Sequence, residues 1–80
     1  MTILLKLSAD APRWYADVGL DMAQRFASEY PDRKGVRDGV FFHVQRGSEF
    51  IGVYVWRTPT GTIKADIATA NPVAVTAADP

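Results

Sequence analysis

The sequence has no cysteine, no excess of charge of either sign and no long hydrophobic run. Without cysteine the chain has no disulfide, no thiol nucleophile and no cysteine metal site, and a small domain without disulfides is most typical of the cytoplasm. Nine basic and nine acidic side chains give a formal net charge of zero, which argues against a dedicated nucleic-acid binder and against a mimic of DNA by bulk charge. No stretch approaches the ~20 apolar residues of a membrane span. The apolar run within residues 1–6 is too short and wrongly flanked for a signal peptide.

A pattern that indicates catalysis is also lacking. His43 is the only histidine, and the spacing places no nucleophile or second titrating group against it, as acid–base or nucleophilic catalysis requires. The carboxylates of Asp10, Asp17 and Asp21 do not have the dense spacing of a calcium loop, and the turns match no phosphate-binding loop. We therefore expect a protein that is not an enzyme and that needs no metal and no cofactor.

What is present is the pattern of one small α+β domain at residues 1–70, followed by a loose tail at 71–80. The spacing predicts a strand at 2–7, a helix at about 11–29 and strands at 40–46, 49–57 and 62–68. Asp10 is expected to cap the helix, Pro12 to lie in its first turn and Pro31 to end it. So short a chain has a thin core, and we predict a β-α-β-β-β fold with one helix packed on one face of a mostly antiparallel four-stranded sheet.

Two turns predict the register of the last three strands. The segment 46–49, Arg-Gly-Ser-Glu, fits a two-residue type II′ turn, and the segment 59–61, Pro-Thr-Gly, fits a three-residue loop with glycine in the left-handed position. The predicted pairs are Arg46 with Glu49, Val44 with Ile51, Phe42 with Val53, Val40 with Val55, Val55 with Ala65 and Val53 with Ile67. The aliphatic partners then share one face, whereas a slip of one residue would scatter them.

This register divides the side chains between two faces of the sheet. One face is apolar and is expected to be covered by the helix. The other has no second helix to cover it and carries Phe41, His43, Gln45, Phe50, Gly52, Tyr54, Trp56, Lys64 and Asp66. Four of these side chains are aromatic, more than an isolated monomer needs on a sheet surface. Lys64 is expected to lie opposite Trp56, within reach of a cation–π contact.

Two features of the chain are candidates for partner binding. Aromatic residues on the uncovered face suit a protein interface, although a homodimer, the tail or curling of the sheet would also cover them. The loop at 31–39 holds a basic cluster that suits phosphates or an acidic protein groove, or is simply solvated. The candidate partner-binding residues are Arg33, Lys34, Arg37, Phe41, His43, Phe50, Tyr54, Trp56 and Lys64. Trp14, projected onto the polar side of the helix, is either an additional anchor or packs on the end of the first strand.

The helix end Ala23-Gln24-Arg25-Phe26-Ala27-Ser28, followed by a turn and antiparallel strands, is similar to one family of type I-F CRISPR inhibitors. More broadly, a short, cysteine-free, one-helix antiparallel chain resembles the small phage-encoded anti-CRISPR proteins that act on type I surveillance complexes. The usage of Ala, Arg and Asp looks like that of proteins from high-GC bacteria such as Rhodobacter, where type I-C inhibitors occur. The loop at 31–39 is longer than in the type I-F family.

The resemblance implies a stoichiometric inhibitor of Cascade, the multisubunit RNA-guided complex, in the cytoplasm of an infected bacterial cell. Such a protein binds Cas subunits and prevents target DNA from loading, and direct nucleic-acid binding is not favoured. The residues hypothesised to occupy a DNA-binding or PAM-reading surface are Arg33, Lys34, Arg37, Tyr54, Trp56 and Lys64. The alternative is a single-stranded nucleic-acid-binding or homodimeric phage accessory protein that uses the uncovered aromatic face. Either a monomer or a homodimer is expected, without membrane contact.

Overall fold

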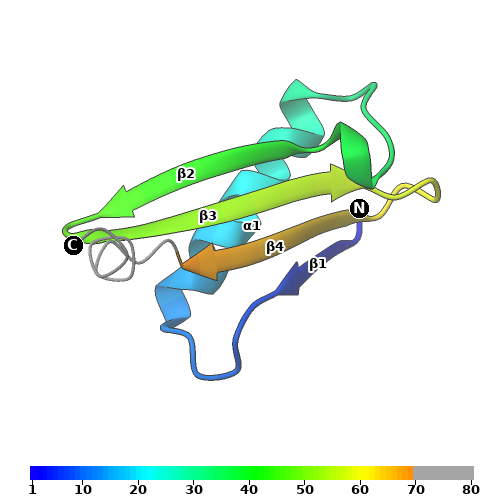
Figure 1. Cartoon of the computed structure of the whole chain (residues 1–80). Helices are drawn as coiled ribbons and strands as arrows, with labels where there is room; N and C mark the ends of the chain where they lie inside the picture. Colours follow the sequence, from blue (N-terminus) through cyan, green and yellow to red (C-terminus); the bar gives the residue numbers. More distant parts are fainter. Residues whose placement is uncertain (70–80) are drawn as a thin grey trace.

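The computed structural model describes residues 1–69, which contain a helix packed against a four-stranded sheet (Figure 1). In chain order the elements are β1 (Ile3–Lys6), α1 (Arg13–Glu29), the short 3-10 helix η1 (Val36–Asp38), β2 (Val40–Arg46), β3 (Glu49–Arg57) and β4 (Ile63–Thr69). The order confirms the predicted β-α-β-β-β fold, and each strand begins and ends within one residue of its expected position. The predicted tail at 71–80 lies outside the described residues.

The structure places β1, whose position in the sheet the sequence pattern left open. The strand order is β1-β4-β3-β2. β1 runs parallel to β4, and the other neighbouring strands are antiparallel. The backbone N–H of Ile63 donates to the carbonyl of Thr2 at 2.9 Å, which joins the beginnings of these two strands. As a result β1 and β2 form the two edges of the sheet.

Both predicted turns are present, and they set the register. A type II′ turn requires a positive φ at its first central residue only. Gly47 has a φ of 62°, and Ser48 does not have a positive φ, because within residues 1–69 only glycines do. Gly61 has a φ of 95°, and its N–H donates to the carbonyl of Thr58 at 2.9 Å. All six predicted strand pairs are confirmed.

The core lies between α1 and one face of the sheet. Its most deeply buried members are Ala23 and Phe26 of the helix and Ile51, Val53, Val55, Ile63 and Ala65 of the sheet. Tyr15, Gly19 and Met22 complete the buried side of the helix, which confirms the apolar face predicted from its periodicity. Complete burial of a large side chain such as Phe26 contributes about 1.5–3 kcal/mol to stability.

The beginning of α1 differs from the prediction. Pro12 is the N-cap residue, with a φ of −57° and an extended ψ of 146°, and no side chain caps the helix. Asp10 lies two residues before that position and accepts a hydrogen bond from the Ser8 hydroxyl instead. This bond lowers the pKa of the Asp10 carboxyl. The predicted Asp10 cap is therefore wrong, because the extended conformation at Pro12 starts the helix beyond its reach.

Trp14 is also placed differently from its projection onto the polar side of the helix. It is half-buried against the core and meets Tyr15 edge-on, with ring centroids 4.7 Å apart and an interplanar angle of 84°. The guanidinium carbon of Arg46 lies 4.9 Å from the Trp14 ring centroid. Trp14 thus packs beneath the end of the β2–β3 hairpin rather than standing out as an anchor.

Candidate functional site

The face of the sheet opposite α1 carries no α-helix among the described residues, and it is the face turned toward the viewer in Figure 1. Strand alternation and the observed register assign to it Leu4, Lys6, Phe41, His43, Gln45, Phe50, Gly52, Tyr54, Trp56, Lys64, Asp66 and Ala68. We call these residues the open face. They include every residue that was predicted for the uncovered side, so the predicted division of the sheet into two faces is confirmed.

Four rings and one ammonium group form a continuous array across the open face. The ring of His43 lies 4.7 Å from that of Phe41, at an interplanar angle of 76°. Phe41 lies 6.5 Å from Tyr54, and Tyr54 lies 5.8 Å from Trp56. At the far end the Lys64 nitrogen is 6.0 Å from the Trp56 ring centroid, which is the predicted cation–π contact. We call this set, from His43 to Lys64, the aromatic array.

Gly52 gives the aromatic array its shape. A Cβ atom on Gly52 would meet the Phe41 ring at 2.5 Å. The tip of the ring therefore lies close against the bare backbone of the central strand β3, a position that only glycine leaves open. Phe41 nevertheless remains 53% exposed, so the array presents a broad apolar surface and is not a closed second core.

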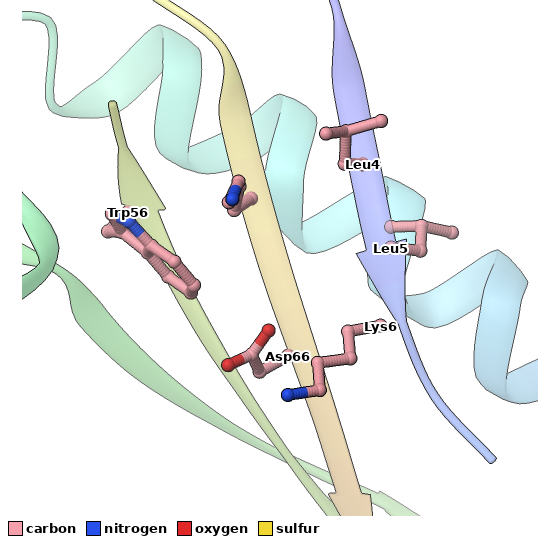
Figure 2. A pocket seen from close by; sticks show the side chains of 6 residues that line it. Leu4, Leu5, Lys6, Trp56 and Asp66 are labelled. Carbon is pink, nitrogen blue, oxygen red and sulfur yellow. The ribbon is translucent and has the colours of Figure 1, made fainter. Parts of the chain in front are cut away.

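Beside the aromatic array, at the β1 edge of the open face, there is a shallow hollow with a volume of about 330 Å³. It is lined by Leu4, Leu5, Lys6, Trp56, Lys64 and Asp66, and Figure 2 shows these side chains coming from β1, β4 and β3. Lys6 and Asp66 are register partners and lie side by side there. The only ion pair within residues 1–69 joins Arg25 to Glu29 on the helix, so the two ammonium groups of the hollow form no ion pair with Asp66.

The predicted site residues fall into three groups. His43, Phe41, Tyr54, Trp56 and Lys64 are brought together in the aromatic array. Phe50 shares the open face but lies near the hairpin turn, 38% exposed and with no ring contact within the described part of the chain. Arg33, Lys34 and Arg37 are exposed on the loop before β2.

Tyr54 joins that loop to the open face. Its hydroxyl donates to the carbonyl of Val36 and accepts from the backbone N–H of Gly39 at 3.2 Å. These bonds hold η1, which contains Arg37, against the sheet next to the aromatic array. Arg33 lies farther away, with its guanidinium carbon 4.9 Å from the Tyr30 ring centroid. The structure therefore brings the η1 part of the basic loop beside the aromatic residues.

Arg57 is an important side chain that the sequence reasoning missed. Its guanidinium donates to the carbonyls of Tyr30 at 2.9 Å, Pro31 at 3.3 Å and Arg33 at 2.7 Å. Since α1 has no basic residue in its last turn, Arg57 supplies from β3 the positive charge that a helix C-terminus favours. The alternation of β3 was the available signal, because it places residue 57 on the helix-covered side with the apolar residues.

Residues 1–69 contain no group of three or more His, Cys, Asp or Glu side chains placed to hold a metal ion. No helix within the same residues is long and apolar enough to cross a membrane. Protein-family models, curated proteins and solved structures give no significant match to this chain.

Proposed function

We propose that the chain is a non-catalytic binding domain that docks a protein partner on its open face. The observation that carries the proposal is the aromatic array, a connected row of half-buried and exposed rings on the sheet face opposite α1. Rings of this kind give a large contact area for little loss of side-chain entropy, and they are enriched at the centres of protein interfaces.

The charges around the array favour a protein over a nucleic acid. The open face carries Lys6 and Lys64 against Asp66, and the whole chain has no net charge. Affinity for a phosphate backbone comes mainly from several cations that each neutralise a phosphate. Two lysines with a carboxylate between them supply little of that affinity, whereas local charges of both signs around an apolar centre are usual for a protein interface.

The particular partner we propose is Cascade of a type I CRISPR system, with the chain acting as a stoichiometric inhibitor that blocks target DNA binding. This step comes from the resemblance to small anti-CRISPR proteins. In this proposal the aromatic array contacts Cas subunits, and the exposed cations of the neighbouring loop, above all Arg37 on η1, occupy positions that otherwise serve DNA.

The proposal is tested with a purified type I effector complex, labelled target DNA and a matched pair of variants. Phe41→Ala removes a ring of the array that is 53% exposed, and Leu20→Ala removes a leucine of α1 that is 42% exposed. We expect the wild-type chain and Leu20→Ala to co-purify with the effector and to block DNA binding equally. Phe41→Ala should weaken association by roughly tenfold or more.

Two results would contradict the proposal. One is that the wild-type chain associates with no type I effector complex. The other is that Phe41→Ala and Leu20→Ala lose the same amount of affinity, since that would place the contact away from the open face. Binding to random single-stranded DNA at low salt would support the nucleic-acid alternative in place of a protein partner.

A further inference from the structure

The outer edge of β2 is a second binding surface, distinct from the open face. β2 is an edge strand of seven residues, paired with β3 on one side only. Its pairing is continuous from Val40 to Arg46, so no bulge interrupts it, and it contains no proline and no lysine. Monomeric proteins usually protect such an edge with one of these devices, because an unpaired strand is a template for another strand.

The hydrogen-bond pattern shows which backbone groups point outward from β2. The Thr58 N–H donates to the carbonyl of Thr62 at 2.8 Å, so even-numbered residues of β3 bond toward β4. The Gly35 N–H donates to the carbonyl of Arg57 at 2.7 Å on the other side, so odd-numbered residues bond toward β2. The odd-numbered residues of β3 are opposite even-numbered residues of β2, as Ile51 is opposite Val44, so the even-numbered residues of β2 are the ones bonded to β3.

The odd-numbered residues Phe41, His43 and Gln45 must therefore direct their backbone N–H and C=O groups away from β3. Within residues 1–69 these outward groups have no backbone partner from a turn, a loop or a cap. The side chains of β2 that face the helix are also incompletely covered: Val40, Phe42 and Val44 are half-buried, while their partners on β3 are fully buried. At this edge, therefore, backbone hydrogen-bonding groups lack strand partners and apolar side chains of the core are only partly covered.

We propose that the β2 edge pairs with the β2 edge of a second copy of this chain, antiparallel and centred on His43. In this register Phe41 opposes Gln45 of the second copy, and His43 opposes His43. Every strand residue from 40 to 46 gains a partner, and the three outward-facing residues of each copy form about six backbone hydrogen bonds. Any other register with the same backbone geometry leaves strand residues unpaired, and a two-fold arrangement closes at a dimer.

The last strand pair of each hairpin, Arg46 and Glu49, faces the helix-covered side and is engaged within its own copy. Arg46 lies over the Trp14 ring, and Glu49 accepts a hydrogen bond from the Tyr15 hydroxyl. The dimer forms through the strand edge, so the open faces stay uncovered and lie on the same side of one continuous sheet.

Amide hydrogen exchange followed by NMR tests the pairing directly, over protein concentrations from about 1 µM to about 1 mM. The amides of Phe42 and Val44 are bonded within one chain and should be protected at every concentration. The amides of Phe41, His43 and Gln45 should become protected only as concentration rises, together with a doubling of the mass in sedimentation. Rapid exchange of these three amides and a monomeric mass at every concentration would overturn the proposal.

Variants separate edge pairing from contact through the open face. His43→Pro removes an outward N–H from each copy and leaves the bonds to β3 intact, so it should raise the dimer Kd by roughly tenfold to a hundredfold. His43→Lys places like charges directly opposite each other and should also weaken the dimer if the proline variant folds poorly. Ala68→Lys, on the same face but on β4, should leave the dimer unchanged. A dimer that is lost in Ala68→Lys and kept in both His43 variants would contradict edge pairing.

Discussion

At the scale of single residues, Arg57 connects parts of the chain that are far apart in sequence. It extends from the end of β3, lies over the Phe26 ring at 5.3 Å and bonds the carbonyls that follow α1. One guanidinium thus provides hydrogen-bond donors for carbonyls at the end of the helix and at the beginning of the basic loop, and it also packs on the Phe26 ring. Its charge is used within the fold, so Arg57 does not belong with the exposed cations that are available to a partner.

Replacing Arg57 by methionine should lower the free energy of unfolding by about 2 kcal/mol, because bonds from a charged donor to several carbonyls are lost together. Arg57→Lys should recover only part of that stability, since a single ammonium cannot reproduce the planar fork of donors. Urea unfolding of the three proteins measures the difference. Equal stability of Arg57→Met and wild type would show that water replaces these bonds without loss.

At this scale the sequence correctly predicted contacts that depend on strand register. It failed for a contact that depends on the backbone conformation of a single residue. The Lys64–Trp56 contact was predicted because the turn at Gly61 fixes their opposition. The Asp10 cap was wrong because the conformation of Pro12 decided the start of the helix. The alternation of β3 indicated the side on which Arg57 lies, but its partners were missed because they are carbonyls of residues 30–33, whose path no sequence pattern indicates.

At the scale of elements, the hairpin turns determine which side chains reach the open face. A shift of one residue at Gly47 would exchange the two faces of β2, and the agreement of every predicted pair shows how strongly the two turns specify the sheet. The position of β1 could not be predicted, because four residues of alternating pattern fit either edge of the sheet equally well.

Gly47→Ala should cost about 1 kcal/mol of stability, because Gly47 has a positive φ that residues with a Cβ atom rarely adopt. Nothing lies within 4 Å of the position where that Cβ would be built, so the cost comes from the backbone and not from a clash. Ser48→Ala, at the neighbouring turn position without a positive φ, is the matched control. Thermal unfolding of both variants gives the comparison, and equal melting temperatures would argue against a type II′ turn.

Tyr54 determines how η1 is attached to the sheet. Tyr54→Phe keeps the ring of the aromatic array and removes the hydroxyl that bonds Val36 and Gly39. We expect a loss of about 1 kcal/mol of stability and faster hydrogen exchange of the Gly39 amide, while the ring contacts of the array persist. Unchanged exchange at Gly39 would mean that η1 is held by other contacts.

At the scale of the whole molecule, the chain has equal numbers of positive and negative side chains. Within residues 1–69, α1 covers one face of the sheet and no α-helix covers the other. The division of the sheet into two faces followed from the sequence, because alternation and turn chemistry are local properties. The sequence could not show whether the open face binds a protein, because the spacing of residues in this chain carries no information about the shape of a partner. The β2 edge also required the structure, since it depends on the order of strands.

The absence of net charge predicts how partner binding depends on salt. Affinity for the protein partner should fall by less than about tenfold between about 50 mM and about 200 mM salt, whereas a protein with many phosphate contacts loses about 10³-fold or more. Isothermal titration at the two salt concentrations measures the change. A steep loss would indicate that the exposed basic loop, and not the aromatic array, supplies most of the affinity.

The central claim is that the open face is the surface that binds the partner, and the lack of cysteine in the chain allows a direct test. A single cysteine is introduced either at Ala68, exposed on the open face, or at Gln24, exposed on α1. The rate of thiol alkylation is then measured for the chain alone and in complex with a type I effector. We predict that alkylation at position 68 slows strongly in the complex while alkylation at position 24 is unchanged. Protection at position 24 with continued reactivity at position 68, or the failure of any complex to form, would contradict the claim.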